Sequence, residues 1–328
     1  MSNPSSTKEK RTSDRKNRTL KEYLLLFSKG ASMGAADVVP GVSGGTIAFI
    51  TGIYEELLGS IRSVNGEAVR LLARLNFAGF WKHINGTFLV VLLSGILFSV
   101  ASLSRLILYL LETYPEMLWA FFFGLIVASA VVVSKKITRW NGAVVLAGLV
   151  GTVAAYFITV MSPTQTPEAY WFIFLSGAIA ICAMILPGIS GSFLLVLLAK
   201  YEFILNAVKD LRIDVVATFA VGCVTGILAF SHVLNWMLKR YHNLTVALLT
   251  GFMIGSLNKV WPWKETITTY TDRHGVVKPL VQENVLPTDY LQLTGQEPYL
   301  LYGVLLAVAG FALVYLIDLI TDDDTKKV

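Results

Sequence analysis

The sequence predicts an all-α integral membrane protein with two inverted-topology repeats, each made of a re-entrant helical hairpin and three transmembrane helices. Three observations lead to this fold class: the apolar composition, a motif that recurs in both halves, and the distribution of basic residues. Of the 328 residues, 55% are hydrophobic and only 15% are charged, whereas about 25% of the residues of a soluble domain are charged. The chain therefore has the composition of a membrane protein.

Six segments are mostly apolar, and most of them approach the length of about 20 residues at which a helix crosses a bilayer. We expect transmembrane helices at 87–110, 117–134, 142–161, 214–237, 243–258 and 299–320. The polar ends of the chain, 1–22 and 321–328, are expected to be cytoplasmic tails. The first tail is basic, is expected to be disordered, and lacks the apolar core and cleavage site of a signal peptide.

A repeat relates the two halves of the chain. The stretch VPGVSGGTIAFITGIYEELLGSI (39–61) aligns with LPGISGSFLLVLLAKYEFILNAV (186–208). Further along, 94–114 aligns with 221–241, and a weaker match relates LVGTVAAYFI to AVAGFALVYLI. These matches divide the membrane region into a first repeat, 23–161, and a second repeat, 170–320.

Each repeat begins with a segment that proline and glycine interrupt, 23–61 in the first repeat and 170–208 in the second. The predicted hairpin turns are at Pro40, Gly41, Pro187 and Gly188. The arm that follows the first turn would be about 24 Å long as one helix, which is too short for a core of about 30 Å. We therefore expect it to return, as a single short helix, to the side from which it came.

Three crossings per repeat place the second repeat upside down relative to the first, as in many secondary transporters. The basic residues agree, because the pieces that this topology puts in the cytoplasm carry 18 of the 27 Lys and Arg residues. The loop 259–298 is then extracytoplasmic, with Trp261 and Trp263 as interfacial anchors. The basic residues are dispersed among loops, which argues against nucleic acid as a partner.

The two hairpin tips provide groups that bind anions. A helix that begins at a tip offers free N–H groups and the positive end of its dipole, and nearby hydroxyls add donors. Two tips that meet near the midplane would form one site for a phosphate or carboxylate. The alternative is a kinked, glycine-packed helix pair without a ligand. The predicted binding residues are Ser43, Gly44, Gly45, Thr46, Ser190, Gly191 and Ser192.

Charged residues within the membrane region are costly and usually functional. Asp37, just before the first tip, is either a coupling site for Na⁺ or H⁺ or a cap for the hairpin backbone. Arg105 is either a phosphate clamp or a side chain that snorkels to the headgroups. Glu55 and Glu202 are candidates for ion coupling, gating or ion pairing.

Other polar residues receive weaker interpretations. Lys29 and Lys200 are expected to snorkel to the membrane surface, and the role of His232 is left open. Cys182 and Cys223 lie in apolar segments, and the histidines show no metal-ligand spacing. We therefore expect neither a disulfide nor a metal site, and no cofactor other than a coupling ion.

The motifs GAADVVPGVSGGTIAFITGIYEELLGSI and LPGISGSFLLVLLAKYE closely resemble those of the bacterial polyprenyl-phosphate transporter family, formerly catalogued as domain of unknown function 368. The resemblance covers about 22–320. It implies a flippase that moves undecaprenyl phosphate from the outer to the inner leaflet of the cytoplasmic membrane and so recycles the lipid carrier for peptidoglycan synthesis. Lys200 departs from the family pattern, in which we expect an apolar residue.

The family motifs match this chain at the two hairpins. The matching positions are Asp37, Pro40, Gly41, Ser43, Gly44, Gly45, Thr46, Tyr54, Glu55, Pro187, Gly188, Ser190, Gly191, Ser192, Tyr201 and Glu202. Two alternatives remain open, a membrane undecaprenyl-pyrophosphate phosphatase and a transporter of another small anion. A phosphatase is disfavoured because no histidine follows either tip. The sequence leaves the oligomeric state open, with a homodimer as one option.

Overall fold

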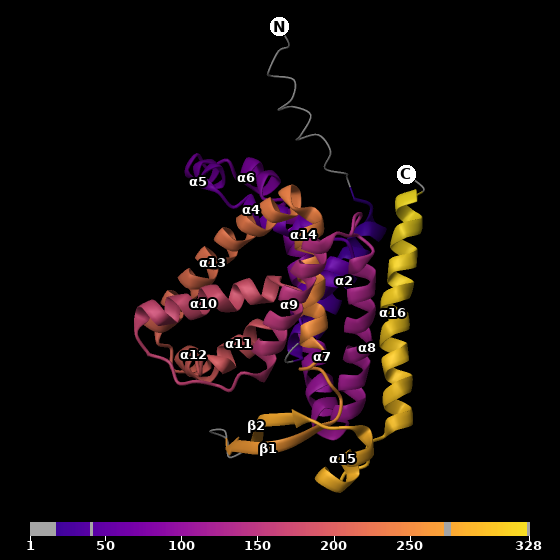
Figure 1. Ribbon diagram of the computed structural model, residues 1–328. Coiled ribbons are helices and arrows are strands. Elements are labelled where there is room, and N and C mark those ends of the chain that lie inside the picture. The colour runs from indigo at the N-terminus through magenta and orange to yellow at the C-terminus, as the bar shows by residue number, and fades with distance from the viewer. Residues whose placement is uncertain (1–17, 40–41, 272–276, 327–328) are drawn as a thin grey trace.

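The computed structural model describes residues 18–39, 42–271 and 277–326, and it is mostly helical (Figure 1). The predicted turn residues Pro40 and Gly41, and most of the predicted tail 1–22, lie outside the described residues. Five of the described helices are long and apolar enough to cross a membrane. They are α7 (Gly86–Thr113), α8 (Pro115–Ser134), α9 (Gly142–Val160), α13 (Ile213–Arg240) and α16 (Leu300–Lys326).

The remaining elements are shorter. In the first half they are α2 (Leu20–Val38), α3 (Gly44–Ile50), α4 (Tyr54–Arg62), α5 (Gly66–Ala73) and α6 (Phe77–His83). In the second half they are α10 (Tyr170–Ile185), α11 (Gly191–Leu197), α12 (Tyr201–Lys209), α14 (His242–Ser256), β1 (Lys264–Thr271), β2 (Val277–Asn284) and α15 (Pro287–Thr294). The short helices α3 and α11 have 7 residues each, α4 and α12 have 9, and α7 and α13 have 28.

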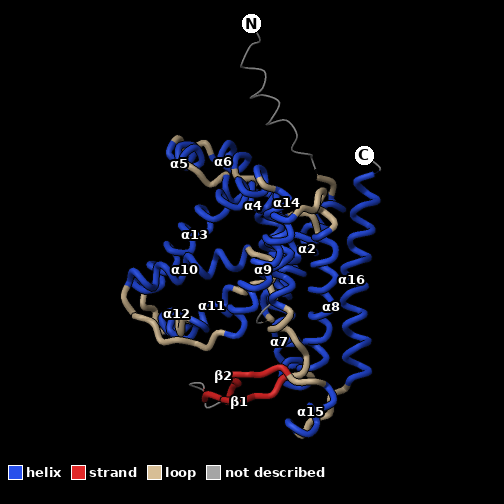
Figure 2. Tube along the Cα trace, in the orientation of Figure 1, coloured by secondary structure: helices blue, strands red, loops and turns tan. Residues whose placement is uncertain are grey.

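We name the two ends of the helix bundle after elements that lie there. At the α4 end, Glu56 of α4 bonds both Arg18, which precedes α2, and Asn85, which precedes α7. At the β end lie the antiparallel strands β1 and β2 together with α15; Figure 2 shows the strands at the opposite end from α5 and α6. The helices α2 and α7 therefore both start at the α4 end.

Polar contacts between helix ends fix the direction of the other long helices. Lys135 at the end of α8 pairs with Asp318 of α16 at 3.1 Å, and α16 ends at the α4 end (Figure 1). At the β end, Asn258, which follows α14, donates to Thr159 near the end of α9 at 2.8 Å. In the second half, Tyr170 at the start of α10 donates to Asp214 at the start of α13 at 2.6 Å.

Glycines allow four pairs of helices to pack closely, α2 with α7, α10 with α13, α8 with α16, and α14 with α9. A Cβ atom on Gly124 of α8 would lie 1.9 Å from the Ala307 carbonyl oxygen, and one on Gly251 of α14 would lie 2.1 Å from that of Gly148. Gly124 and Gly251 occupy positions that the predicted repeat aligns.

Three sequence expectations need correction. Each returning arm is two helices rather than one, because the chain breaks where Gly52 and Ala199 have φ of 74° and 51°, and α11 and α12 are bent by 102°. The predicted span 243–258 is a helix of only 15 residues, α14. The loop 259–298 contains strands, and the loop 62–86 contains α5 and α6.

We predict that Gly124→Val destabilises the protein by about 1–3 kcal/mol, because the added side chain would force α8 and α16 apart. The matched control is Gly59→Val, since a Cβ at Gly59 meets nothing within 4 Å. Thermal unfolding of the two purified variants measures the difference. Equal stability of both variants would contradict the close approach of α8 and α16.

Candidate functional site

The two hairpin tips contact each other, and Ser43 lies at the centre of this contact. We call residues 42–46 the first tip and residues 184–193 the second tip. The Ser43 side chain is fully buried, and its hydroxyl lies 3.1 Å from the Met184 carbonyl oxygen and 3.2 Å from that of Leu186. Both carbonyls belong to the end of α10, where the helix leaves them without an internal partner. A side chain of the first tip therefore satisfies the backbone of the second.

Two more side chains of the first hairpin form hydrogen bonds with the backbone of the second tip. The amide of Gly188 donates to the Thr46 hydroxyl at 3.0 Å, and the Tyr54 hydroxyl donates to the Ile185 carbonyl at 3.0 Å. Gly188 has φ of 87°, and a Cβ there would lie 2.9 Å from the backbone of Met253. Only glycine fits this turn without strain. We call these contacts, with those of Ser43, the tip junction.

The first tip uses its own donors internally. The amide of Gly44 donates to the Asp37 carboxylate at 2.7 Å, that of Gly45 to the Ser43 hydroxyl at 3.1 Å, and that of Thr46 to the Ser43 carbonyl at 3.0 Å. These are the first three amides of α3. In this conformation the carboxyl group of Asp37 already occupies the start of the helix.

The second tip differs in this respect. Within the described part of the chain, the first three amides of α11, those of Gly191, Ser192 and Phe193, have no hydrogen-bond partner. The Ser190 hydroxyl, which occupies the capping position, instead lies 2.9 Å from the Ser192 hydroxyl. The position that aligns with Asp37 is Met184, so this tip has no acid of its own. Among the described residues, the first amides of α11 are therefore unpaired, whereas those of α3 are bonded.

A small pocket adjoins the second tip, and it contains a lysine that the sequence analysis did not single out. Its lining includes Ser190 and Phe193 of the tip, Thr159 of α9, and Lys259, which follows α14. The Lys259 ammonium lies 4.6 Å from the centre of the Phe193 ring. Burial lowers the pKa of Lys259. Because Lys259 is far from the tip in sequence, only the fold reveals that the two are neighbours.

The segment after Lys259 covers the β end. The indole N–H groups of Trp261 and Trp263 donate to the carbonyls of Val285 and Pro298, both at distances below 3 Å. Lys264 donates to the Lys259 carbonyl at 2.5 Å and lies over the Trp119 ring. Trp261 and Trp263 therefore bond other parts of the segment 259–298, and their predicted role as interfacial anchors stays a prediction.

Two ionisable groups at this end are perturbed by burial. Burial, reinforced by the nearby charge of Lys259, keeps the pKa of Lys264 well below its usual value. Burial and the hydrogen bond to the Glu116 carboxylate raise the pKa of Tyr290. The Glu116 side chain is itself buried, so this bond fixes α15 to the start of α8. The cover over the β end is thus fixed by polar contacts as well as by aromatic side chains.

The other predicted site residues are not brought to the tip junction by any described contact. Arg105 lies exposed on α7, and Glu55 and Glu202 lie exposed in the first turns of α4 and α12. His232 is also exposed, with Nδ1 2.7 Å from the Leu228 carbonyl. Their proposed roles stay predictions. Pro187 and Gly188 lie in the turn between α10 and α11.

The snorkelling interpretation of the two lysines is wrong. Lys29 donates to the carbonyl of Thr51, the residue that caps the end of α3, at 2.7 Å. Lys200 is 2% exposed and donates to the Thr166 carbonyl at 2.8 Å, with the Phe172 and Phe203 rings within 6 Å of its ammonium. The ammonium of Lys29 therefore caps a helix end, which leaves carbonyls that require donors, and that of Lys200 bonds the loop between α9 and α10.

This arrangement defines a class of protein: a multi-pass helical membrane protein in which two interrupted helical segments meet and bond each other's backbone. The chain belongs to the VCA0040-like family, described as undecaprenyl phosphate translocase-like, whose model matches residues 33–278.

Two relatives show how far the similarity extends. The polyprenyl-phosphate transporter of Vibrio cholerae serotype O1 is 48% identical over 292 residues, which cover 89% of this chain and 95% of that protein. The polyprenyl-phosphate transporter of Staphylococcus aureus is 32% identical over 258 residues, or 71% and 84% of the two chains. No solved structure matches the chain.

We predict that Tyr54→Phe destabilises the protein by about 1 kcal/mol, because it removes a buried donor and leaves the Ile185 carbonyl unsatisfied. The matched control is Tyr201→Phe, since the aligned Tyr201 is 39% exposed. Thermal unfolding of both variants measures the effect. If the two substitutions cost the same, the hydrogen bond of Tyr54 does not contribute to the tip junction.

Proposed function

We propose that this protein is a flippase that moves a polyprenyl phosphate, in bacteria undecaprenyl phosphate, from the outer to the inner leaflet of the cytoplasmic membrane. The observation that carries the proposal is the second tip, whose first amides have no partner among the described residues and whose Ser190 lines the Lys259 pocket. The names of the two relatives support the same substrate class. Return of the carrier to the inner leaflet would supply cell-wall synthesis, with both termini in the cytoplasm.

The proposed architecture is two inverted repeats with re-entrant hairpins. Equivalent helices run in opposite directions: α7 starts at the α4 end, whereas its counterpart α13 starts beside the beginning of α10 and leads into α14, which ends at the β end. The contact of Arg18 with Glu56 supports a re-entrant path, because it joins the entry of the first hairpin to its returning arm. Such repeats usually place the substrate site between them.

The first tip indicates how the second would hold its ligand. At α3, a carboxylate of this chain takes the first amide of the helix. At α11 the aligned amide has no such partner, so a substrate phosphate would occupy the place that Asp37 occupies at α3. Ser190 and Ser192 would donate from the tip, and the ammonium of Lys259 would balance the charge. The predicted binding residues of the first tip would become available only if the tip junction opened.

The prenyl chain need not pass through the protein. The long helices expose many large apolar side chains, as helices that face lipid do. The phosphate alone carries charge, and a charged group pays a large cost in the hydrocarbon core. The protein would therefore shield the headgroup while the tail stays in the bilayer. Such transfer makes and breaks no covalent bond in the lipid, whereas a phosphatase would cleave a phosphate ester or anhydride bond.

Asp37 is proposed as the coupling site for H⁺ or Na⁺. Its carboxylate competes with substrate for the start of α3, because both are anions that the same amide can bind. Neutralisation by a proton or a cation would release that amide. The hydrogen bond to Gly44 also fits the capping role that the sequence left open, and the two roles are compatible.

We predict that Lys259→Gln raises the substrate level for half-maximal transfer about tenfold, because a charge-assisted contact to the phosphate is lost. The assay follows a fluorescent short-chain polyprenyl phosphate between the leaflets of protein-containing liposomes. Lys209→Gln removes the same charge at an exposed position and should leave transfer unchanged. No transfer by the wild type would refute the proposed function, and an unaffected Lys259→Gln variant would remove this lysine from the site.

A second prediction concerns coupling. Asp37→Asn keeps an oxygen acceptor for the Gly44 amide and removes the group that binds a proton or cation. We expect normal thermal stability together with a transfer rate that no longer responds to pH or Na⁺ gradients. The measurement compares wild type and variant in liposomes under each gradient. A variant that loses stability but keeps the wild-type ion response would leave Asp37 as a cap only.

A further inference from the structure

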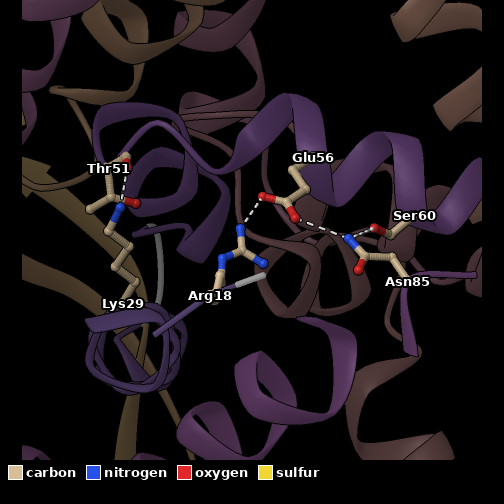
Figure 3. Close-up of polar contacts among 6 residues, drawn as sticks. All are labelled: Arg18, Lys29, Thr51, Glu56, Ser60 and Asn85. Carbon is tan, nitrogen blue, oxygen red and sulfur yellow. Dashed lines mark hydrogen bonds and ion pairs between the residues drawn. The ribbon is translucent and has the colours of Figure 1, made fainter. Parts of the chain in front are cut away.

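A second group of cations lies at the opposite end of the molecule from Lys259. At the α4 end, Glu56 accepts from Arg18 Nη2 at 2.5 Å and from Asn85 Nδ2 at 2.9 Å (Figure 3). The Arg18 guanidinium also lies 5.3 Å from the centre of the Phe88 ring. Three separate segments therefore meet at one carboxylate, at the point where the first hairpin enters and returns.

Two lysines extend this group toward the first tip. Lys29 Nζ donates to the Thr51 carbonyl at 2.7 Å, and Lys136 Nζ donates to the Phe49 carbonyl at 3.3 Å. Both carbonyls lie at the end of α3, where the helix dipole is negative. Figure 3 shows Lys29 in the same view as Arg18 and Glu56, with its ammonium bonded to Thr51. Arg18 thus pairs with Glu56, while Lys29 and Lys136 both donate to carbonyls at the end of α3.

The second hairpin has no acid at the aligned position. Glu56 aligns with Phe203 in the second repeat, where the Lys200 and Arg212 cations lie 5.4 Å and 5.7 Å from the Phe203 ring. The base of that hairpin therefore forms without a carboxylate at the aligned position. The Arg18 and Glu56 side chains remain 24% and 35% exposed, so a ligand can reach them from outside. An arginine with one exposed carboxylate is well suited to exchange it for a phosphate, which accepts the same paired hydrogen bonds.

We propose that Arg18 and Lys29 form a second phosphate-binding subsite at the α4 end, in which Glu56 serves as an internal counter-ion until a phosphate monoester displaces it. The inference rests on the proposed function and deepens it. The Lys259 pocket binds the headgroup on the side of the β end, and the Arg18 subsite binds it on the other side. Lys136 contributes positive potential at the end of α3.

The test uses the full-length protein in liposomes made of zwitterionic lipid. Vesicles captured through a C-terminal affinity tag present the α4 end outward, because α16 ends there. A fluorescent short-chain polyprenyl phosphate is placed in the outer or the inner leaflet, so that transfer begins at either end. Inorganic phosphate added outside is a competitor that distinguishes free phosphate from the lipid headgroup.

We expect Arg18→Gln and Lys29→Gln to raise the half-saturating substrate level about tenfold for transfer that begins at the α4 end, and to change it little for the other direction. Lys259→Gln should raise the half-saturating level for transfer that begins at the β end and change it little for transfer that begins at the α4 end. Lys21→Gln, an exposed lysine in the first turn of α2, is the charge-matched control. Thermal unfolding of each variant checks that it is folded.

Glu56→Gln distinguishes the two possible roles of Glu56. If Glu56 is a displaceable counter-ion, its removal should strengthen substrate binding, and if it forms a structural ion pair, its removal should weaken binding. Without the competing carboxylate, half-saturation at the α4 end should fall by about threefold or more. A rise in half-saturation, or equal effects of the Arg18 and Lys29 variants on both directions, would overturn the subsite. Competition by inorganic phosphate without any effect of the variants on lipid transfer would also overturn it, as a site for free phosphate only. Absence of transfer by the wild type would instead refute the proposed function.

Discussion

The structure depends on the need to satisfy backbone groups where two helices break in the interior of the protein. Each unsatisfied amide or carbonyl there costs several kcal/mol by order of magnitude. Ser43, Thr46 and Tyr54 of the first half supply partners to the backbone of residues 184–188 in the second. The two interrupted segments therefore stabilise each other, and neither could be buried alone in this conformation.

The same contacts make the two tips unlike. The first tip has Asp37 and Thr46, which accept from the Gly44 and Gly188 amides, whereas the second has Met184 and Phe193 at the aligned positions. Among the described residues, one sequence motif thus yields a tip whose first amides are bonded and a tip whose first amides are not. In two identical tips the first helix amides would be bonded in both or unbonded in both, and a ligand would not prefer either tip. The departures from the repeat are therefore as informative as the repeat itself.

Much of this fold follows from local sequence patterns, and the parts that do not follow have a common cause. Apolar length predicts α7, α8, α9, α13 and α16 because lipid imposes a span on each helix independently. The break after α3 was missed because it depends on the positive φ of Gly52 within an otherwise helical pattern. The partners of Lys29 and Lys200 are backbone carbonyls, which carry no sequence signal. Lys259 reaches the second tip only through the packing of α14 against α9.

The placement of charge gives the proposed path a physical rationale. A phosphate that crosses a low-dielectric region must exchange one set of donors for another without standing free between them, because its charge is costly to desolvate. Lys259 lies at one end, Arg18 and Lys29 lie at the other, and the broken helices α3 and α11 lie between them with their amides at the tips. The carboxylates of Glu56 and Asp37 would keep the first set of donors neutralised while no substrate is present. An internal carboxylate and a substrate phosphate would exclude each other at the same donors. The donors would therefore be neutralised by the internal carboxylates when no substrate is bound. They would be neutralised by the phosphate when substrate is bound, so neither state would contain an uncompensated charge.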